Sequence, residues 1–375
     1  FTGRLSVLNY NLETMTEWKT RFEGEVRGEL AGQKFLVDEL WDAIPAKEKK
    51  SGKDGSKASA EQAGFSDTEI NEYTQYVNAK LKVNMVLLLK EIVFKKIKFA
   101  EMRTGLDLNN RSAIVSSSMK AYGGAMTSYL QLDMNAPGLG YSLDGTLSGV
   151  QTGEFVNAGV DSFFSGWIAD LAKDKISGAA EANFWITGKG SNVKAIKQNL
   201  VGKVDFKLID GKLKNWSVLS DGLKALGVNP SGEIPFRQMT GKTRILSQKV
   251  YIDELKVTCD DARYNLGSGG WAGFDKDLDS EIQLPIRNDF SPSISSKLGD
   301  AGKFAAGQDG WLPVDFDVFG RMASPSFKPN MDRSFKNAGQ KLEAEAKKKV
   351  EEEGKKATEE LKKKGEQLLK GLFGK

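Results

Sequence analysis

The chain has 375 residues, of which 54 are Lys or Arg and 50 are Asp or Glu, and its net charge is +4. This length allows a large buried core and about two domains. Histidine is absent, which excludes Ser/His/Asp and Cys/His nucleophile systems, imidazole bases and nearly all zinc-hydrolase sites. We therefore expect a protein that is not an enzyme and that has no catalytic residue, bound metal or cofactor.

The positive charge is concentrated at the C-terminal end. Residues 333–375 contain 13 basic and 8 acidic residues, so residues 1–332 together have a net charge of −1. A nucleic-acid-binding body needs a basic face of its own, and we expect no nucleic-acid partner. Cys259 is the single cysteine. It cannot form an internal disulfide, so cysteine usage does not indicate a cellular compartment.

The first 72 residues divide into a β segment and a linker. Residues 21–30 alternate charged and apolar side chains, which is typical of a half-buried strand, and residues 1–44 are predicted to form strands. From Pro45 to about Ser66 the sequence is rich in Lys, Gly, Ser and Ala and has almost no apolar residue. Residues 45–72 are therefore predicted to be a solvated linker, sensitive to protease within 46–66.

Residues 73–332 are predicted to form a second, larger β region. Short runs of alternating apolar and polar residues recur along it, beginning at Leu81–Met85. Many runs are separated by residues that adopt positive φ at low cost, such as Asn109-Asn110, Asp144-Gly145 and Asp210-Gly211. Such dipeptides between alternating runs predict hairpin turns.

Helices are expected at three places. Two are short: one at about 192–200 is closed by Gly202, and one at about 218–226 stops at Gly227. The third is a long charged helix over 333–375, in which apolar or small residues recur about every 3.7 positions, a spacing that keeps the stripe nearly straight. We expect this helix to project from the β region. Its last apolar residues either dock on an anionic membrane or a partner, or belong to a solvated helix without a target.

Three segments resemble known binding loops but lack residues or elements that those loops need. Gly241–Thr243 resembles the end of a phosphate-binding loop, but position 236 is Phe where that loop needs Gly. Residues 267–272 fit a loose dinucleotide pattern without the helix that must follow it. Asp275, Asp277 and Asp279 are spaced like calcium ligands, but the essential Gly and Glu of that loop are missing. We interpret the first segment as a turn, the second as a hairpin and the third as the solvent-exposed side of a strand.

Several segments carry a likeness to a known family. They are Ala121–Ala125, the helix at Gly190–Leu200, the strands Val201–Leu213, Met239–Pro285, and Trp311–Gly320 followed by Pro325 and Pro329. Together these segments resemble the C-terminal domain of the AsmA family, over about residues 81–330. The motifs are structural patterns, so they specify a fold better than an activity. The membrane helix and most of the N-terminal repeats of that family are not in this sequence.

The resemblance implies a protein of the bacterial envelope that is linked to outer-membrane assembly and phospholipid traffic. It implies a periplasmic location, with an inner-membrane anchor upstream of Phe1. It also implies a long, strongly curved and largely antiparallel β-sheet with an apolar inner face, related to bridge-like lipid-transfer proteins. Phospholipid and other envelope proteins are the partners that follow from it.

Elementary physics leads to a related expectation. A sheet of alternating strands has one apolar face that must be covered, and residues 70–330 contain few helices to cover it. The sheet must therefore curl, either closing around an ordinary core or staying open as an apolar groove. The residues expected to contact lipid, each of which could equally be structural core, are Val204, Phe206, Leu208, Leu255, Val257, Ile282, Leu284, Val314, Phe316 and Val318.

Three functions follow from this sequence. The first is a non-enzymatic protein that shields phospholipid acyl chains in an apolar β-groove. The second is a scaffold for envelope assembly without a lipid ligand. The third is an enzyme that uses a carboxylate pair or a Ser/Lys nucleophile, although nothing in the sequence brings such groups together.

Overall fold

A computed structural model describes most of the predicted β region. The described residues are 2–8, 24–36, 74, 77, 79–94, 96–163, 173–190, 193–214, 232–259, 266–275, 277–287, 311–312, 314–321, 324–330 and several helical positions between 332 and 359. The predicted linker at 45–72 and the predicted helix at 218–226 lie outside the described residues.

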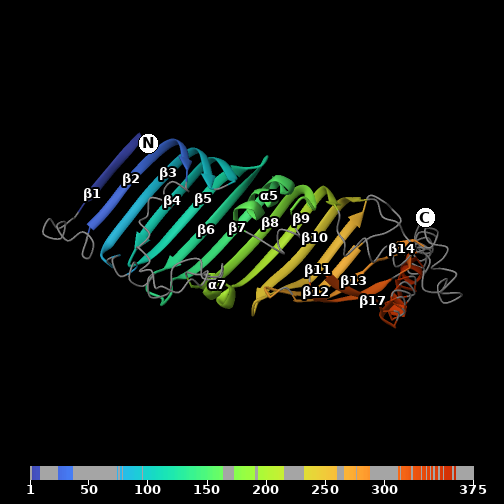
Figure 1. The fold of residues 1–375 in the computed structure, drawn as a ribbon. Helices are drawn as coiled ribbons and strands as arrows, with labels where there is room; N and C mark the ends of the chain where they lie inside the picture. Colours follow the sequence, from blue (N-terminus) through green and yellow to red (C-terminus); the bar gives the residue numbers. More distant parts are fainter. Residues whose placement is uncertain are drawn as a thin grey trace, which may run out of the picture.

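The chain is mainly β. Fifteen strands form one sheet in the order β1-β2-β3-β4-β5-β6-β7-β8-β9-β10-β11-β12-β13-β16-β17, and two short strands, β14 and β15, form a separate pair (Figure 1). Their bounds are β1 Thr2–Leu8, β2 Gly24–Leu36, β3 Leu81–Phe94, β4 Ile97–Asn109, β5 Ser112–Ala121, β6 Gly124–Asp133, β7 Gly140–Gln151, β8 Ile176–Lys189, β9 Val201–Lys214, β10 Glu233–Leu246, β11 Lys249–Cys259, β12 Leu266–Gly273, β13 Asp277–Gln283, β14 Ile286–Arg287, β15 Trp311–Leu312, β16 Asp315–Arg321 and β17 Ser324–Pro329.

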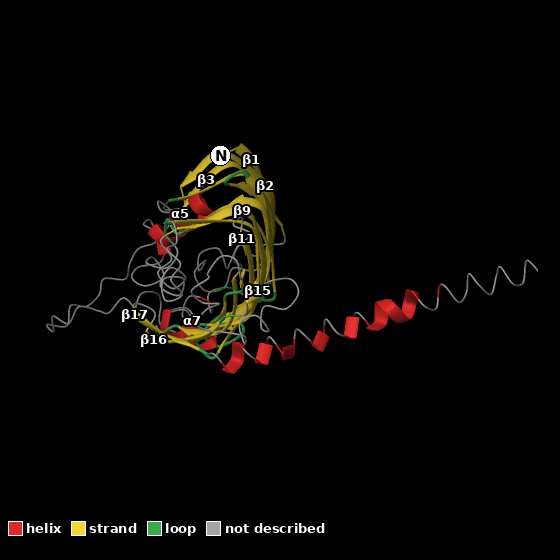
Figure 2. Cartoon of the chain, turned by 90° about the vertical axis from the view of Figure 1, so that its right-hand side faces the viewer, coloured by secondary structure: helices red, strands yellow, loops and turns green. Residues whose placement is uncertain are grey.

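The sheet is open and almost entirely antiparallel. Its order begins at β1 and ends at β17 without a pairing between them, so the closed-sheet alternative is excluded. The one parallel junction joins β2 to β3, where Gly24 is opposite Leu81. The strands bend into an arc when viewed along the sheet (Figure 2). β1 and β2, the described strands of the segment predicted over 1–44, thus share one continuous sheet with the larger β region.

The predicted turns were correct in one case and wrong in two. Asn110 and Arg111 have φ of 47° and 59° and connect β4 to β5, as expected. Asp144-Gly145 lies inside β7 and Asp210-Gly211 inside β9. Asp210 does adopt a positive φ of 49°, but its neighbours Ile209 and Gly211 continue to pair with β10. The extra residue is accommodated as a bulge against β8, where the register shifts, rather than as a turn.

Within the described residues, two helices interrupt the strands. The predicted helix after position 191 is confirmed as α7, Val193–Asn199. The other, α5 at Thr152–Phe163, was not predicted, because Gly153 and Gly159 make its sequence a poor helix former. Thr152 Oγ1 donates a hydrogen bond of 2.9 Å to the carbonyl of Gly178 on β8. Both helices lie on the open side of the arc in Figure 2.

The segment after β17 is fastened to β16 by buried polar contacts. Asp315 is only 1% exposed, and its backbone N–H donates to Ser334 Oγ at 2.9 Å. Asn337 Nδ2 donates to the Asp315 carboxylate, also at 2.9 Å. Arg333 forms ion pairs with Asp317 and, at 3.4 Å, with Glu281. These contacts fix the first helical turn after residue 331 to the end of the sheet. The single long helix predicted over 333–375 is not shown, because only separate helical positions are described there.

Burial gives Asp315 an unusual titration. Desolvation raises the pKa of its carboxyl group above the ordinary value, against the opposing hydrogen bond from Asn337 and the charge of Arg333. A raised pKa in the folded state means that this group stabilises the fold most below its unfolded pKa of about 4, and that this stabilisation is lost as the pH rises through the folded pKa.

We therefore expect Asp315→Asn to gain stability relative to the parent as the pH rises from about 4 to 7, because the amide keeps an acceptor for Asn337 and carries no charge. Urea unfolding of both proteins at several pH values measures the difference. Asp279→Asn, which changes an exposed carboxylate on β13, should show a much smaller trend. A difference between Asp315→Asn and the parent that stays constant with pH would contradict the assignment.

Candidate apolar binding face

The two faces of the sheet differ sharply in composition. In β6, Met126, Ser128, Leu130 and Leu132 are half-buried, whereas Thr127, Tyr129 and Gln131 between them are exposed. Bending crowds the side chains on the concave side of a sheet and spreads those on the convex side. The less exposed, apolar face is therefore the concave one, and the polar face is convex.

An unbroken line of apolar residues crosses the whole sheet on the concave face. Each member is the direct register partner of the next, so together they run perpendicular to the strands. We name this line the apolar lane; its members, from β1 to β17, are Leu5, Gly28, Met85, Leu106, Val115, Leu130, Leu143, Ile186, Gly202, Ile245, Val250, Ala272, Leu278, Gly320 and Pro325.

The apolar lane is long and only partly covered. With adjacent strands about 4.8 Å apart, its fourteen steps span roughly 67 Å. Leu130 and Leu143 in its centre are half-buried, and Leu5 at the β1 end is 58% exposed. No member is charged. Such a line offers a continuous apolar contact surface rather than a set of separate pockets.

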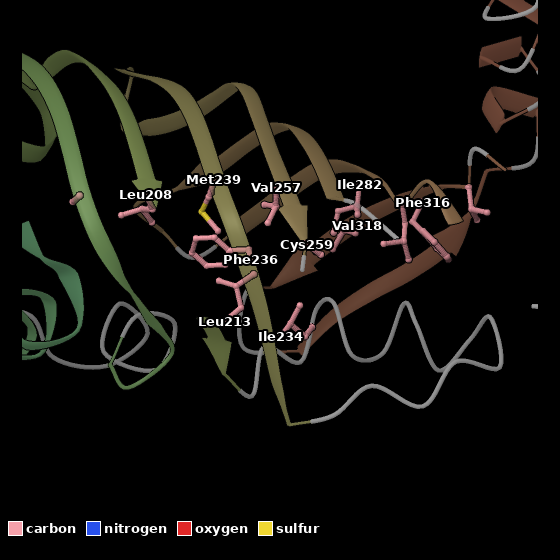
Figure 3. Close-up of a cluster of buried hydrophobic side chains, with 13 residues drawn as sticks. Leu208, Leu213, Ile234, Phe236, Met239, Val257, Cys259, Ile282, Phe316 and Val318 are labelled. Atoms are coloured by element: carbon pink, nitrogen blue, oxygen red, sulfur yellow. The ribbon is translucent and has the colours of Figure 1, made fainter. Parts of the chain in front are cut away.

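A buried hydrophobic cluster lies beside the lane in the C-terminal half of the sheet (Figure 3). Seven of the ten residues predicted to contact lipid belong to it: Leu208, Val257, Ile282, Leu284, Val314, Phe316 and Val318. Phe206 and Leu255 pack against it, and Val204 is half-buried on the same face. The structure thus brings all ten together on the concave face. Leu284, Phe316 and Val318 are each 1% exposed, which places them in the core of this end.

The apolar lane is not predictable from the pattern within single strands. None of the ten predicted residues is a member of it, because they were chosen from alternation within single strands. The lane becomes visible only when the strand register is known, since register decides which residue of each strand stands opposite which residue of the next. The alternating runs at 21–30 and Leu81–Met85 include the members Gly28 and Met85, but neither run shows that these two residues stand opposite each other.

A line of small hydroxyl residues runs parallel to the lane, two residues along each strand and therefore on the same face. Thr104, Ser117 and Ser128 are consecutive register partners on β4, β5 and β6, and Thr104 Oγ1 and Ser117 Oγ lie 2.9 Å apart. Elsewhere on this face burial raises the pKa of Tyr141, whose hydroxyl has no hydrogen-bond partner among the described residues. The concave face is therefore apolar with a few uncharged hydroxyls.

Phenylalanine rings lie flat on glycines of the neighbouring strand at three places on this face. A Cβ on Gly145 would stand 2.2 Å from the ring of Phe184, one on Gly241 2.3 Å from Phe206, and one on Gly211 2.3 Å from Phe236. A glycine leaves the backbone bare, so an aromatic ring from the next strand can cover it. Each of these rings therefore lies against the backbone of the neighbouring strand.

This packing predicts a specific cost. Gly241→Ala should destabilise the protein by about 1–3 kcal/mol, because the methyl group must displace the Phe206 ring. Gly269→Ala on β12 is the matched control: its nearest neighbour, the Ile252 carbonyl oxygen, would lie 3.7 Å away, so little change is expected. Denaturant unfolding measures both, and the Phe206→Leu background should reduce the cost of Gly241→Ala. Equal costs for the two alanine variants would show that the ring does not rest on Gly241.

The described residues contain neither a candidate metal site nor a candidate membrane-spanning helix. Among them, no group of three or more Cys, Asp or Glu side chains is placed to hold a metal ion. No helix in the described ranges has the length and hydropathy needed to cross a membrane. Searches against family models, curated proteins and solved structures found no match to this chain.

Proposed function

We propose that this protein binds and transfers lipid without catalysis, by shielding phospholipid acyl chains in a groove formed by the concave face. The observation that supports this most directly is the apolar lane, which continues across all fifteen strands without a charged residue. An ordinary structural core needs only a compact cluster. A half-buried apolar line of roughly 67 Å suits an elongated apolar ligand.

The energetic benefit of such a groove is large. Each methylene exposed to water costs roughly 0.8 kcal/mol, so a phospholipid with about thirty methylenes faces a barrier on the order of 20 kcal/mol when it crosses an aqueous space. Contact with the lane and with the Phe184 and Phe206 rings replaces that water. The headgroup remains hydrated on the open side of the arc, so no charged residue is needed inside.

The two halves of the concave face have different roles in this proposal. The half that contains the buried cluster, around Phe236 and Phe316, stabilises the fold. The half over β3–β8, where Met85, Met126 and Leu130 are only half-buried, receives acyl chains. The unbranched, flexible side chain of methionine adapts to ligands of differing shape.

The setting of this activity rests on the AsmA resemblance. We propose a periplasmic protein, anchored in the inner membrane through a segment upstream of Phe1, that supports outer-membrane assembly together with other envelope proteins. The basic segment 333–375 adds a second contact with anionic lipid, because its surplus of five positive charges is attracted to such surfaces.

Extraction of the purified protein with organic solvent tests the proposal. We expect phospholipid to co-purify in a reproducible ratio to protein, and purified protein to take up a fluorescent diacyl phospholipid from vesicles. A protein that carries no lipid and takes up none is instead a structural component of envelope assembly. Extraction before and after detergent exchange separates bound lipid from contaminating membrane.

A further inference from the structure

We propose a second binding site, for an uncharged saccharide, on the convex face of the sheet. It centres on a surface depression of about 570 Å³ that crosses β4 to β7. The convex face lies on the opposite side of the sheet from the apolar lane. This site is therefore independent of the proposed lipid function.

Hydroxyl groups form most of the polar lining of the depression. Ser116, Ser118, Thr127 and Thr146 are exposed on the convex face and line it, and the Thr127 and Thr146 hydroxyls lie 2.7 Å apart. A hydroxyl can both donate and accept a hydrogen bond. Such a surface complements a ligand that itself carries many hydroxyls, as a saccharide does.

The charges of the depression are balanced and separated. Arg103 on β4 and Asp144 on β7 are the two charged residues of its lining, and three strand spacings, roughly 14 Å, separate their backbones. A charged ligand of either sign would be attracted by one of these two groups and repelled by the other, and each group has a single charge. The arrangement favours a neutral ligand whose hydroxyls donate to the carboxylate and accept from the guanidinium.

Two exposed aromatic rings flank Asp144. Tyr129 on β6 and Trp185 on β8 are its direct register partners, and they are 43% and 38% exposed. An aromatic ring offers a flat apolar face, and the hydroxyl of Tyr or the indole N–H of Trp adds a polar group, so both side chains suit a ligand that is partly apolar and partly polar. The two backbones are two strand spacings apart, roughly 10 Å, so both rings can stack on the C–H faces of one oligosaccharide while Asp144 accepts hydrogen bonds between them.

Other ligands fit this surface less well. A nucleic acid needs a surplus of positive charge, and the lining has none. A protein partner needs an apolar centre to its interface, whereas Val86 is the one aliphatic side chain in this lining. The combination of two exposed rings, hydroxyls and balanced charge therefore favours a saccharide.

Isothermal titration with four linear hexasaccharides, of glucose, mannose, galactose and N-acetylglucosamine, tests the site. We expect at least one to bind with a dissociation constant below 1 mM, about the upper limit for a specific small-ligand site. Trp185→Ala and Tyr129→Thr, which keeps a strand-forming residue, should each weaken that binding at least tenfold. Quenching of tryptophan fluorescence in the parent but not in Trp185→Phe provides a second readout.

Phe319→Ala is the matched control. Phe319 is 44% exposed on β16, far from the depression along the sheet, so its removal should leave saccharide binding unchanged. Circular dichroism melting confirms that each variant is folded. The proposal is overturned if none of the four hexasaccharides binds. It is also overturned if binding survives in folded Trp185→Ala and Tyr129→Thr, or if Phe319→Ala weakens it equally.

Discussion

Leu284→Glu should unfold the C-terminal half of the sheet. Leu284 is 1% exposed within the buried cluster, and its backbone N–H donates to the carbonyl of Val314 at 2.8 Å. Removing a buried leucine side chain alone costs about 2–5 kcal/mol, and a carboxylate without a partner adds a further penalty of several kcal/mol. The sum is comparable with the whole stability of a typical domain, about 5–15 kcal/mol.

The adjacent residue provides the control for this experiment. Gln283 lies next to Leu284 at the end of β13 but is exposed on the other face, so Gln283→Glu adds the same charge to water and should leave the melting temperature nearly unchanged. Leu284→Met conserves volume and should cost less than about 1.5 kcal/mol. A soluble Leu284→Glu protein that melts near the parent would show that this end of the concave face is open to solvent.

Alternation within a strand was enough to predict which residues share a face. Val257 and Phe316 were both expected on the apolar side, and both lie in the buried cluster. This succeeds because successive side chains of a strand point to opposite faces, whatever its partners are. The mainly β, largely antiparallel architecture follows from the same pattern.

Local turn preferences were a poorer guide to where strands end. Asp144-Gly145 favours a hairpin by composition, yet it continues as strand because both of its neighbours, β6 and β8, pair through it. The turn between β10 and β11 is made instead by Ser247 and Gln248, at φ of 51° and 62°. Neither is a residue that prefers positive φ. Strand pairing supplies more hydrogen bonds than one dipeptide's preference can offset, so it decides the position of the turn.

The candidate site depends on information that single-strand patterns do not contain. Each step of the apolar lane, for example Val115 opposite Leu130 and Leu130 opposite Leu143, is fixed by the register between two strands. Shifting one strand by a single residue would place a polar side chain in the line. The sequence therefore predicted an apolar face, and only the strand register showed where on that face a continuous line exists.

The difference in burial along this face predicts opposite results for the same substitution at two positions. Leu130→Glu changes a half-buried member of the apolar lane on β6. Its carboxylate can reach water when the groove is empty, so we expect a melting temperature within a few degrees of the parent. With acyl chains present, the carboxylate would lie against methylenes, at a cost of several kcal/mol to lipid binding. Since 1.4 kcal/mol corresponds to a factor of ten, lipid retention should fall at least tenfold.

Gln131→Glu separates this effect from charge alone. Gln131 is the next residue of β6 and is exposed on the convex face, so its variant should keep both its stability and its lipid. Phospholipid per mole of protein, measured by solvent extraction and by uptake of a fluorescent diacyl phospholipid, is compared for the parent and both variants. If Leu130→Glu stays folded and retains its lipid, the lane does not hold acyl chains. If it unfolds as Leu284→Glu should, Leu130 is part of a closed core, because only a carboxylate that cannot reach water imposes its full desolvation cost on the fold itself.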